Sequence, residues 1–488
     1  MKPIKKIFAI IAAAFLAMSF TACGEGGSAS SADADSLETS STEELQPQGE
    51  ALMTAGVVSD TQLEADVGPL ASNYNAPAQF KRALEYYKAI DVDVLFFLGD
   101  IVNNAQQSSY DLYNSIMDEV FPDKSARPEI LFNVGNHERF VGVSGKPNND
   151  KEFTDKQFTE NTGEELRAHK KIKGYSFITI DTNVYDSNDC ITRGSLNYLE
   201  KEAASAAEEA DGKPIFVGIH PPVAGTTYGS FGNSDATAQS SQIDGILRRY
   251  PNVILFTAHC HYPLADERSI YQKEYTAVNT GSCSYCCLGA KNEEGKIANS
   301  AGIKFDNVKS DGSYRPYPNE LTGANSHDQG QGLVVKAYEN AVTIDRINFN
   351  TGKAFGGQWI VPAAPTTDDF IYTDKRGETD PVPEWKEGHE AEAVLDGLQI
   401  KISWKEAMTE GAPVESYVVS AVKFGTDIPL AQKCIVSDYY AALGEPGRYA
   451  LKLSLTEVAS KYQVKIQPYN CFGRSGEPLY IDVAGPRI

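Results

Sequence analysis

Five short hydrophobic runs in the chain each end at a residue that can bind a divalent metal ion. The runs are rich in β-branched and aromatic residues and are bounded by polar ones, which is typical of buried strands in an α/β fold. The residues at their ends are Asp60, Asp100, Asn136, His220, and the pair His259 and His261. Because ligands collect at the carboxyl ends of strands in open α/β sheets, we expect one edge of one sheet to gather these side chains. Carboxylate, amide and imidazole groups together suit a pair of divalent ions.

Length and charge narrow the possible classes of protein. The 488 residues exceed what one hydrophobic core usually holds, so we expect two domains with appendages. The formal net charge is −22, from 66 acidic and 44 basic residues. Such a balance repels phosphate backbones, so nucleic acid is not an expected binding partner. An anionic substrate would need the positive charge of bound metals.

The N-terminus has the pattern of a bacterial signal peptide, predicted at 1–22. Three lysines among the first six residues precede an apolar run at 7–20, which is too short to span a bilayer comfortably as a mature helix. Residues 20–24 resemble a lipobox, in which Cys23 becomes lipid-modified and begins the mature protein; ordinary secretion with cleavage nearby is the alternative. Residues 23–50 are rich in Ser, Ala, Gly and Glu and predict a flexible tether. We therefore expect an exported protein, anchored by lipid to the membrane at the bacterial cell surface or in the periplasm.

Seven cysteines remain beside Cys23, and their positions do not resemble a small disulfide scaffold. Cys283, Cys286 and Cys287 lie close together just after an expected strand. A thiolate metal site is one interpretation of this cluster. Small buried residues beside the sheet are the favoured one.

Residues 51–362 alternate apolar strands with amphipathic helical stretches, which predicts a layered α/β domain. The polar segment 142–173 is expected to cover the site as a loop or small cap, where substrate selection would occur. Residues 332–362 alternate in the β manner between turn signals, and we expect them to form hairpins that close a second sheet.

A linker rich in Pro, Asp and Thr is predicted at 363–390, and short strands at regular spacing follow at 391–488. This pattern predicts a C-terminal all-β sandwich. The strands resemble a fibronectin type III domain, with Trp404 on an inner strand and Tyr462 of a later strand near a corner. Its expected role is that of a spacer or surface-contact module.

Four sequence blocks within the α/β domain resemble the calcineurin-like metallophosphoesterase superfamily. They are Gly99-Asp100, Gly135-Asn136-His137-Glu138, His220, and His259-Cys260-His261. The family pattern is D-x-H, GD, GNH[DE], H and GHxH, in this order, and the resemblance covers 51–362. It implies a fold in which a layered β-sandwich is flanked by helices, α/β/β/α, and a phosphoric ester hydrolase with two divalent metal ions, Mn, Fe or Zn.

The resemblance also implies how the metals are held. Asp100 would bridge the two ions, because a carboxylate can give one oxygen to each. The first site would be completed by Asp60, Gln62 and His261, and the second by Asn136, His220 and His259. A water shared by the two ions would lose its proton near neutral pH, and the resulting metal-bridging hydroxide would attack phosphorus in line.

Two catalytic residues are implied beside the ligands. His137 would lie by the leaving oxygen as a general acid, or as a donor to the developing charge. Glu138 would accept a hydrogen bond from that imidazole and orient it.

Two positions depart from the family pattern, and a third excludes one branch of the superfamily. Gln62 stands where the first motif has an imidazole, so the first ion is expected to bind less tightly or to be harder than zinc. Ala258 replaces the glycine of the last motif. This replacement requires only that the backbone angles at position 258 be ones that a non-glycine residue adopts. A purple acid phosphatase would place a Tyr ligand at position 103, and Asn103 excludes that branch.

Other polar residues are better explained by structure than by chemistry. A single Asp after a strand is usually a turn or cap residue, which is the interpretation for Asp181. Tyr175 and Asn183 are expected to pack. The histidines outside the pattern are expected on the surface or in structural roles. They are His169, His327 and His389.

The leading hypothesis is an exported phosphoesterase acting on small phosphomonoesters or phosphodiesters. The alternative is a surface lipoprotein with a binding or adhesion role whose catalytic site has decayed, which Gln62 and the sandwich favour and the retained His137 disfavours. A 5′-nucleotidase is a third hypothesis. It would carry a large C-terminal nucleotide-binding domain, whereas 391–488 has the pattern of a sandwich.

Overall fold

The structure is a computed structural model that describes residues 45–485 apart from eight gaps. These are 69–70, 142–150, 186–187, 231–234, 288–301, 309–329, 427 and 443–447. The expected signal peptide, Cys23, most of the expected tether and His327 lie outside the described residues. Among helices of the described part, none is long and apolar enough to cross a membrane.

Six strands form the first sheet, in the order β14-β13-β12-β1-β2-β3. β1, β2 and β3 run parallel, whereas β12 pairs antiparallel with β1 and continues into hairpins with β13 and β14. The predicted hairpins therefore form, but they extend the sheet of β1 instead of closing a second one, because β12 pairs the other edge of β1. The bounds are β1 Met53–Val58, β2 Val94–Phe97, β3 Glu129–Phe132, β12 Gln331–Ala337, β13 Ala341–Asn348 and β14 Lys353–Pro362.

The second sheet also has six strands, in the order β10-β11-β9-β8-β5-β4. Its central strands β5, β8, β9 and β11 are parallel, and β4 and β10 pair antiparallel at the two edges. The bounds are β4 Ala168–Ile172, β5 Tyr175–Thr179, β8 Ile215–Gly218, β9 Val253–Thr257, β10 Ile270–Gln272 and β11 Thr276–Asn279. A small separate ribbon pairs β6 Asn183–Tyr185 with β7 Asn188–Cys190.

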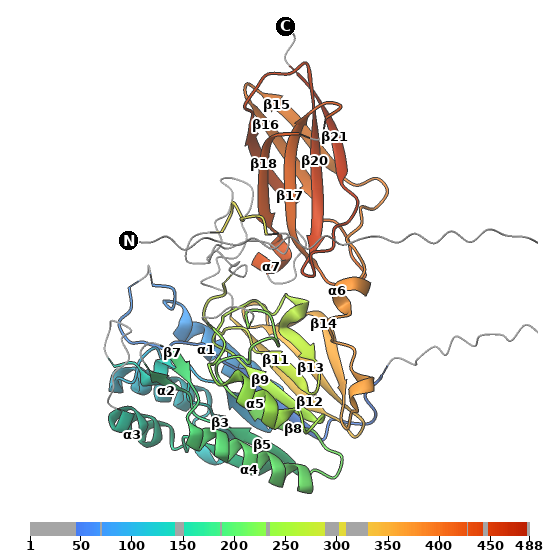
Figure 1. Ribbon diagram of the computed structural model, residues 1–488. Coiled ribbons are helices and arrows are strands. Elements are labelled where there is room, and N and C mark those ends of the chain that lie inside the picture. The colour runs from blue at the N-terminus through green and yellow to red at the C-terminus, as the bar shows by residue number, and fades with distance from the viewer. Residues whose placement is uncertain are drawn as a thin grey trace, which may run out of the picture. The chain divides into compact units, whose positions relative to one another are not determined.

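The two sheets face each other across a shared core. The ring of Phe96 on β2 contacts those of Phe177 on β5 and Phe256 on β9, with centroids 5.7 and 6.0 Å apart. Helices α1 to α3 pack on the outer face of the first sheet, and α4 and α5 on that of the second (Figure 1). The predicted α/β/β/α architecture is confirmed. The helix bounds are α1 Ala76–Ala89, α2 Gln107–Val120, α3 Lys151–Thr162, α4 Arg193–Glu209 and α5 Ser240–Leu247.

Helix α1 illustrates why these segments become helices. Its residues Phe80, Ala83, Leu84 and Tyr87 recur at helical spacing and are all buried. A proline lies in the first turn, where its missing N–H would have no partner in any helix. The hydroxyl of Tyr87 donates to the carbonyl oxygen of Val57 at 2.8 Å, which fixes the helix to β1.

The C-terminal region is a sandwich of two antiparallel sheets, β15-β16-β19 and β18-β17-β20-β21. Trp404 on β16 is fully buried and stacks on Tyr449, with ring centroids 5.1 Å apart. The hydroxyl of Tyr462 on β20 accepts from the backbone N–H of Ala459 at 2.7 Å, which forms the predicted corner. The region is consistent with the fibronectin type III resemblance.

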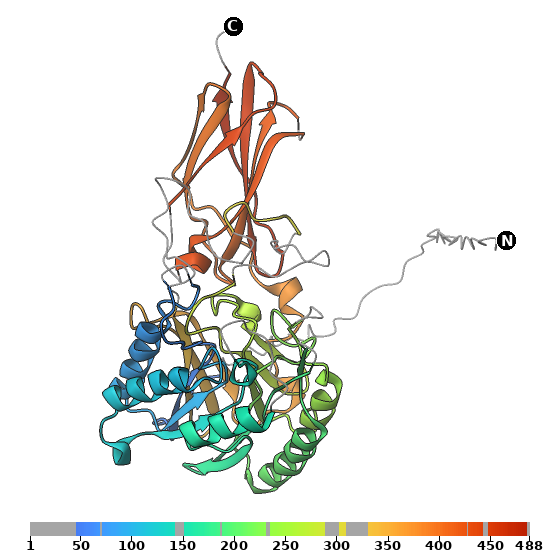
Figure 2. The same ribbon diagram turned by 90° about the vertical axis from the view of Figure 1, so that its left-hand side faces the viewer.

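The strands of this sandwich can be followed from two sides (Figures 1 and 2). Short helices lie before and within it, α6 Arg376–Thr379 and α7 Asp438–Ala442. Its strands are β15 Ala391–Asp396, β16 Gln399–Lys405, β17 Val414–Lys423, β18 Pro429–Val436, β19 Arg448–Ser454, β20 Lys461–Asn470 and β21 Leu479–Ala484.

Candidate metal centre

The predicted metal ligands follow strands of both sheets. Asp60, Asp100 and Asn136 come just after β1, β2 and β3 of the first sheet, whereas His220 and His259 come just after β8 and β9 of the second. The sequence predicts that all ligands gather at one edge of one sheet. This is wrong, because the ligands follow strands of two sheets. The ligands meet because the carboxyl ends of the parallel strands of two facing sheets lie at the same rim of the domain.

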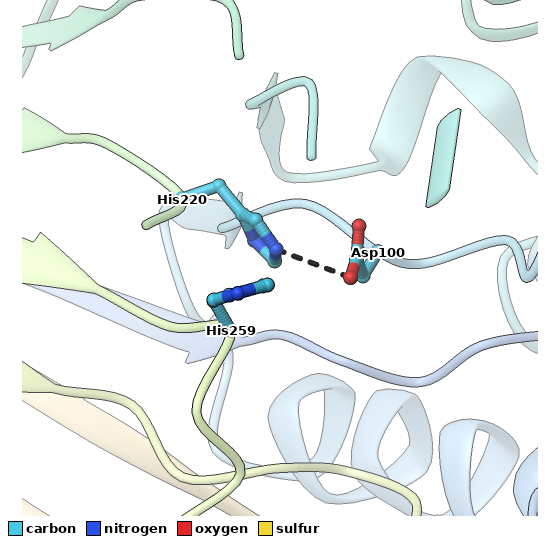
Figure 3. Close-up of side chains that lie close together, drawn as sticks. All are labelled: Asp100, His220 and His259. Carbon is cyan, nitrogen blue, oxygen red and sulfur yellow. Dashed lines mark ion pairs between the residues drawn. The ribbon is translucent and has the colours of Figure 1, made fainter. Parts of the chain in front are cut away.

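One group of ligands gathers around Asp100, His220 and His259, whose ligand atoms all lie within 4.8 Å of one another (Figure 3). Oδ2 of Asp100 is 3.1 Å from Nε2 of His220. Oδ1 of Asn136 lies 3.0 Å from Nε2 of His220 and 3.0 Å from Nδ1 of His259. Four of the predicted ligands thus point at one small volume.

The hydrogen bonds of His220 indicate which kind of ligand could bind among these four side chains. Its Nδ1 lies 2.7 Å from the carbonyl oxygen of Leu98, which can only accept, so Nδ1 carries the proton. In the neutral imidazole, Nε2 then presents a lone pair to the oxygens of Asp100 and Asn136. One carboxylate oxygen, one amide oxygen and two imidazole nitrogens gathered in this way form a donor set that fits a divalent metal ion.

A second group has the same arrangement around His261. Its Nδ1 donates to the carbonyl oxygen of Tyr285 at 3.1 Å, which directs Nε2 toward Oδ1 of Asp60 at 3.2 Å. That carboxylate oxygen is buried, and within the described part of the chain it accepts no hydrogen bond. Nε2 of Gln62 lies 3.3 Å from Nε2 of His261, and rotation of the amide would present its oxygen there. This group also fits a cation.

Charges within the two groups lower the pKa values of the carboxylates and raise that of His261. Burial would raise the pKa of Asp60, but the imidazoles of His261 and His220 outweigh it and lower that pKa. Asp100 behaves likewise, since His220 and His137 outweigh burial and lower its pKa. Burial would lower the pKa of His261, but the charge of Asp60 raises it. The carboxylates are therefore ionised and able to bind metal at neutral pH.

The backbone at the site is unusual. Five of the predicted ligands have left-handed backbone angles, with φ between 51° and 71°. They are Asp60, Gln62, Asp100, His259 and His261. Such conformations cost on the order of 1 kcal/mol or more per residue and persist only where surrounding contacts hold them. These backbone conformations direct the ligand side chains toward the two groups described above.

Two glycines of the motifs allow the strand ends to approach. Gly99 has a φ of 91°, and a Cβ there would lie 2.7 Å from both the backbone nitrogen of Gly135 and Nδ1 of His220. A Cβ at Gly135 would collide with Oδ1 of Asp100. A side chain at either position would displace a predicted ligand.

Comparison with known families agrees with this geometry. Residues 53–263 match the family described as Calcineurin-like phosphoesterase, and this span contains every predicted ligand and His137. The span is a calcineurin-like phosphoesterase domain. This domain supports a phosphoric ester hydrolase, and divalent metals are its implied cofactors.

Two of the solved structures to which the chain shows a partial similarity are phosphatases. A dimetal phosphatase from Danio rerio shares 10% identity at a TM-score of 0.40, covering 64% of this chain and 100% of its own. A purple acid phosphatase from yellow lupin (Lupinus luteus) seeds shares 13% identity at a TM-score of 0.41, covering 66% of this chain and 57% of its own. No curated protein sequence matches the chain.

In the phosphoesterase domain, His137 lies beside the ligand groups and is partly open to solvent. Its backbone N–H donates to Oδ1 of Asp100 at 2.8 Å, and its ring packs on Phe140 with centroids 4.7 Å apart. Nδ1 lies 2.9 Å from the carbonyl oxygen of Asn103 and therefore carries a proton. Nε2 is 3.8 Å from Oδ2 of Asp100, and the side chain is 22% exposed. Nε2 also lies 3.3 Å from the amide nitrogen of Gln62, so it faces the ligand groups while Nδ1 is held by a backbone carbonyl.

Glu138 does not orient His137, which corrects the expectation from the sequence. Its buried carboxylate accepts from four backbone N–H groups at 2.8 to 3.2 Å, those of Gly135, Asp100, Ile101 and Val102. Neighbouring residues in a tight turn point to different sides, so the two side chains diverge. Burial, and then the charge of Asp100, raise the pKa of Glu138 to about 7. Its role is to hold the loop that carries Asp100.

Asp181 is a buried structural residue, although it follows β5 at the same rim. It accepts from the hydroxyl of Ser195 at 2.6 Å and from Asn183 at 3.0 Å, and pairs with Arg139 at 3.4 Å. Arg139 also pairs with Asp155 of α3, in the described part of the expected cap. Arg139 thus ties that helix to the turn carrying His137, a link that sequence reasoning missed.

Two histidines lie in other surroundings. His169 contacts Oε2 of Glu202 through Nδ1 at 2.8 Å and the hydroxyl of Ser176 through Nε2 at 3.1 Å. His389 packs edge-on against Trp385 in the segment before the sandwich. Their contacts agree with structural roles.

The residues after β11 pack beside the second ligand group. The ring of Tyr285 lies 4.4 Å from that of His261, a neighbour that no motif in the sequence indicates. Cys283 and Cys286 are buried, and burial raises the pKa of both, that of Cys283 to about 12. Protonated, buried thiols agree with packing residues. Tyr175 likewise lies in the core between the sheets.

Proposed function

We propose that this protein is an exported phosphoesterase that uses two divalent metal ions to hydrolyse small phosphomonoesters or phosphodiesters. The observation that carries the proposal is the convergence of the predicted ligands in two groups, around His220 and around His261, with His137 beside them. Bound ions would neutralise the charge of the phosphate and activate the attacking water as a bridging hydroxide.

The residues divide into two ligand sets. Asp60, Gln62 and His261 would hold the first ion. Asn136, His220 and His259 would hold the second, and Asp100 would contribute to both. Mn, Fe and Zn all accept this mixture of oxygen and imidazole ligands, with harder ions favoured where Gln62 replaces an imidazole.

His137 would act on the leaving group. With its Nδ1 proton donated to the carbonyl oxygen of Asn103, only Nε2 is available to the substrate. In the imidazolium form, which carries a proton on both nitrogens, Nε2 would give its proton, or a hydrogen bond, to the leaving oxygen as the bond of that oxygen to phosphorus breaks.

Turnover of model esters tests this proposal. We expect nitrophenol release from mono- or bis-nitrophenyl phosphate in the presence of Mn, Zn or Fe, loss of activity with a chelator, and recovery when metal is returned. His137→Ala should lower kcat about 100-fold or more while elemental analysis still finds the metals. Absence of turnover with every ion, together with a His137→Ala variant that equals the wild type, would refute it.

The proposed location rests on the N-terminal sequence. Lipid attached at Cys23 would hold the protein on the outer side of the cytoplasmic membrane or on the cell surface. Cys23→Ser should move the protein from the membrane fraction to the soluble fraction of cells and abolish incorporation of labelled palmitate. A variant that remains in the membrane fraction would contradict the anchor.

Gln62 favours a second candidate, a surface lipoprotein whose catalytic site has decayed. In that case less than one tightly held metal per chain is expected from protein purified without chelator. Two metals per chain together with ester turnover would eliminate it.

A further inference from the structure

A chain of hydrogen bonds leads away from His137 and ends at Glu64. The imidazole Nδ1 donates to the backbone carbonyl oxygen of Asn103 at 2.9 Å. The side-chain amide of the same residue donates to Oε2 of Glu64 at 2.6 Å, and that of Asn104 donates to Oε1 at 3.0 Å. One carboxylate thus binds two consecutive amides, and hydrogen bonds to an ionised acceptor are among the strong ones.

The two amides have little freedom to turn. Oδ1 of Asn104 accepts from the backbone N–H of Gln106 at 3.1 Å and from the hydroxyl of Ser109 at 2.9 Å, at the start of α2. Its NH₂ group must therefore face Glu64. The backbone N–H of Asn103 donates to the carbonyl oxygen of Leu63 at 2.9 Å, which draws the segment of Glu64 alongside.

This arrangement takes over the task expected of Glu138, whose carboxylate is occupied by backbone N–H groups. A catalytic imidazole needs a partner at one nitrogen to fix its tautomer and its orientation. Here the partner is a backbone carbonyl, and its direction depends on how residue 103 is held. Glu64 holds that residue by its side chain.

We propose that Glu64 is a positioning residue for the phosphoryl-transfer chemistry: through the amide of Asn103 it aims the carbonyl that orients His137. The inference rests on the proposed function. Glu64 touches neither the substrate nor a predicted ligand side chain in this scheme, and its effect reaches the reaction only through the imidazole.

A purely structural role for Glu64 makes a different prediction. If it only stabilised the loop after β2, its loss would disturb Asp100 and the bound metals. That loop has an anchor of its own, however, because Glu138 accepts from the N–H groups of Asp100, Ile101 and Val102. Removing Glu64 should therefore leave metal content unchanged.

A double-mutant cycle separates the two roles. Glu64→Ala should lower kcat roughly 10- to 100-fold, with KM within about twofold of wild type and no change in bound metal. In a His137→Ala background the same substitution should cause no further loss. The matched control is Glu85→Ala, at an exposed carboxylate on α1 whose ion pair with Lys81 is long at 3.9 Å. An equal loss in both backgrounds, or loss of metal, would overturn the proposal.

An exchange of amide and carboxylate provides a rescue. Glu64→Gln turns an NH₂ group toward one of the two amides, and Asn103→Asp places two carboxylates together, so each single variant should lose activity. Combined, the new Gln donates to the new Asp and still accepts from Asn104, so kcat should recover by about tenfold over the single variants. A double variant no better than either single one would contradict the chain of contacts.

A readout independent of turnover keeps failure of this inference distinct from failure of the proposed function. The ¹⁵N shifts of the His137 imidazole, assigned by their absence in His137→Ala, should report a proton on Nδ1 at pH 8 in the wild type. In Glu64→Ala they should report a mixture of tautomers. Unchanged shifts would refute the positioning role even if the protein hydrolyses esters, and changed shifts would support it even if the tested esters are not substrates.

Discussion

The carboxylate of Glu138 accepts a hydrogen bond from the backbone N–H of Asp100 at 2.8 Å. With its three other backbone donors, Glu138 therefore closes the strained loop after β2 around a residue that would bridge two metals. Its position directly after His137 suggests a catalytic partner, but its contacts are those of a loop anchor.

Glu138→Ala is expected to weaken folding and metal binding together. Its removal leaves several buried N–H groups unsatisfied at about 1 to 3 kcal/mol each, so we expect a loss of about 3 kcal/mol or more in the free energy of unfolding. Urea unfolding of the chelated protein measures this loss, and Glu85→Ala serves as the exposed control. A variant that unfolds like the wild type and loses only kcat would restore Glu138 to a catalytic role.

Gln62→His is expected to strengthen the first metal site. The amide lies 3.3 Å from Nε2 of His261, and an imidazole is a stronger ligand than an amide for ions such as zinc. The backbone φ of 55° at this position is tolerated by His better than by most residues. Competition with a coloured chelator should show about tenfold tighter binding of one zinc ion per chain, with the other ion unaffected. Equal affinity would place Gln62 outside the coordination sphere.

Much of this site is predictable because the ends of strands and the residues of a motif can be identified from short stretches of the sequence. The runs before Asp100 and His220 identify buried strands, and the order of the ligand blocks identifies the family. The partners of Glu138 and of His137 are not local in this sense. These partners depend on the left-handed backbone conformation of Asp100 and on the hydrogen bonds between the loops after β2 and β3. The motif itself indicates only that an imidazole and a carboxylate are neighbours in the sequence.

The sequence could not predict that the ligands are divided between two sheets, for a similar reason. Runs that end at Asp60 and at His259 look alike, and a hydrophobic strand does not reveal which sheet it joins. The pairing of β1 with β12 and of β9 with β11 decides this, through contacts between residues far apart along the chain.

Gly135→Ala is expected to abolish metal binding at both sites, because Asp100 would contribute to both ions. The added Cβ would collide with Oδ1 of Asp100 and would lie 2.6 Å from the backbone nitrogen of the same residue. Elemental analysis should find less metal, and kcat should fall with it. Gly245→Ala in α5 is the matched control, because a Cβ there meets nothing within 4 Å. That control should keep its metals and gain up to about 1 kcal/mol in the free energy of unfolding.

Tyr462→Phe is expected to destabilise the C-terminal sandwich without affecting the metals. The hydroxyl of Tyr462 accepts from the backbone N–H of Ala459 at 2.7 Å and lies 3.3 Å from the carbonyl oxygen of Glu457, so its loss leaves a buried N–H without a partner. We expect a cost of about 1 to 3 kcal/mol in the free energy of unfolding. Tyr480→Phe is the control, since that side chain is 49% exposed and should cost almost nothing. Thermal unfolding followed by tryptophan fluorescence measures the difference, with a Trp359→Phe background removing the signal of the buried tryptophan in the phosphoesterase domain. Equal midpoints for the two variants would show that the corner hydrogen bond does not stabilise the sandwich.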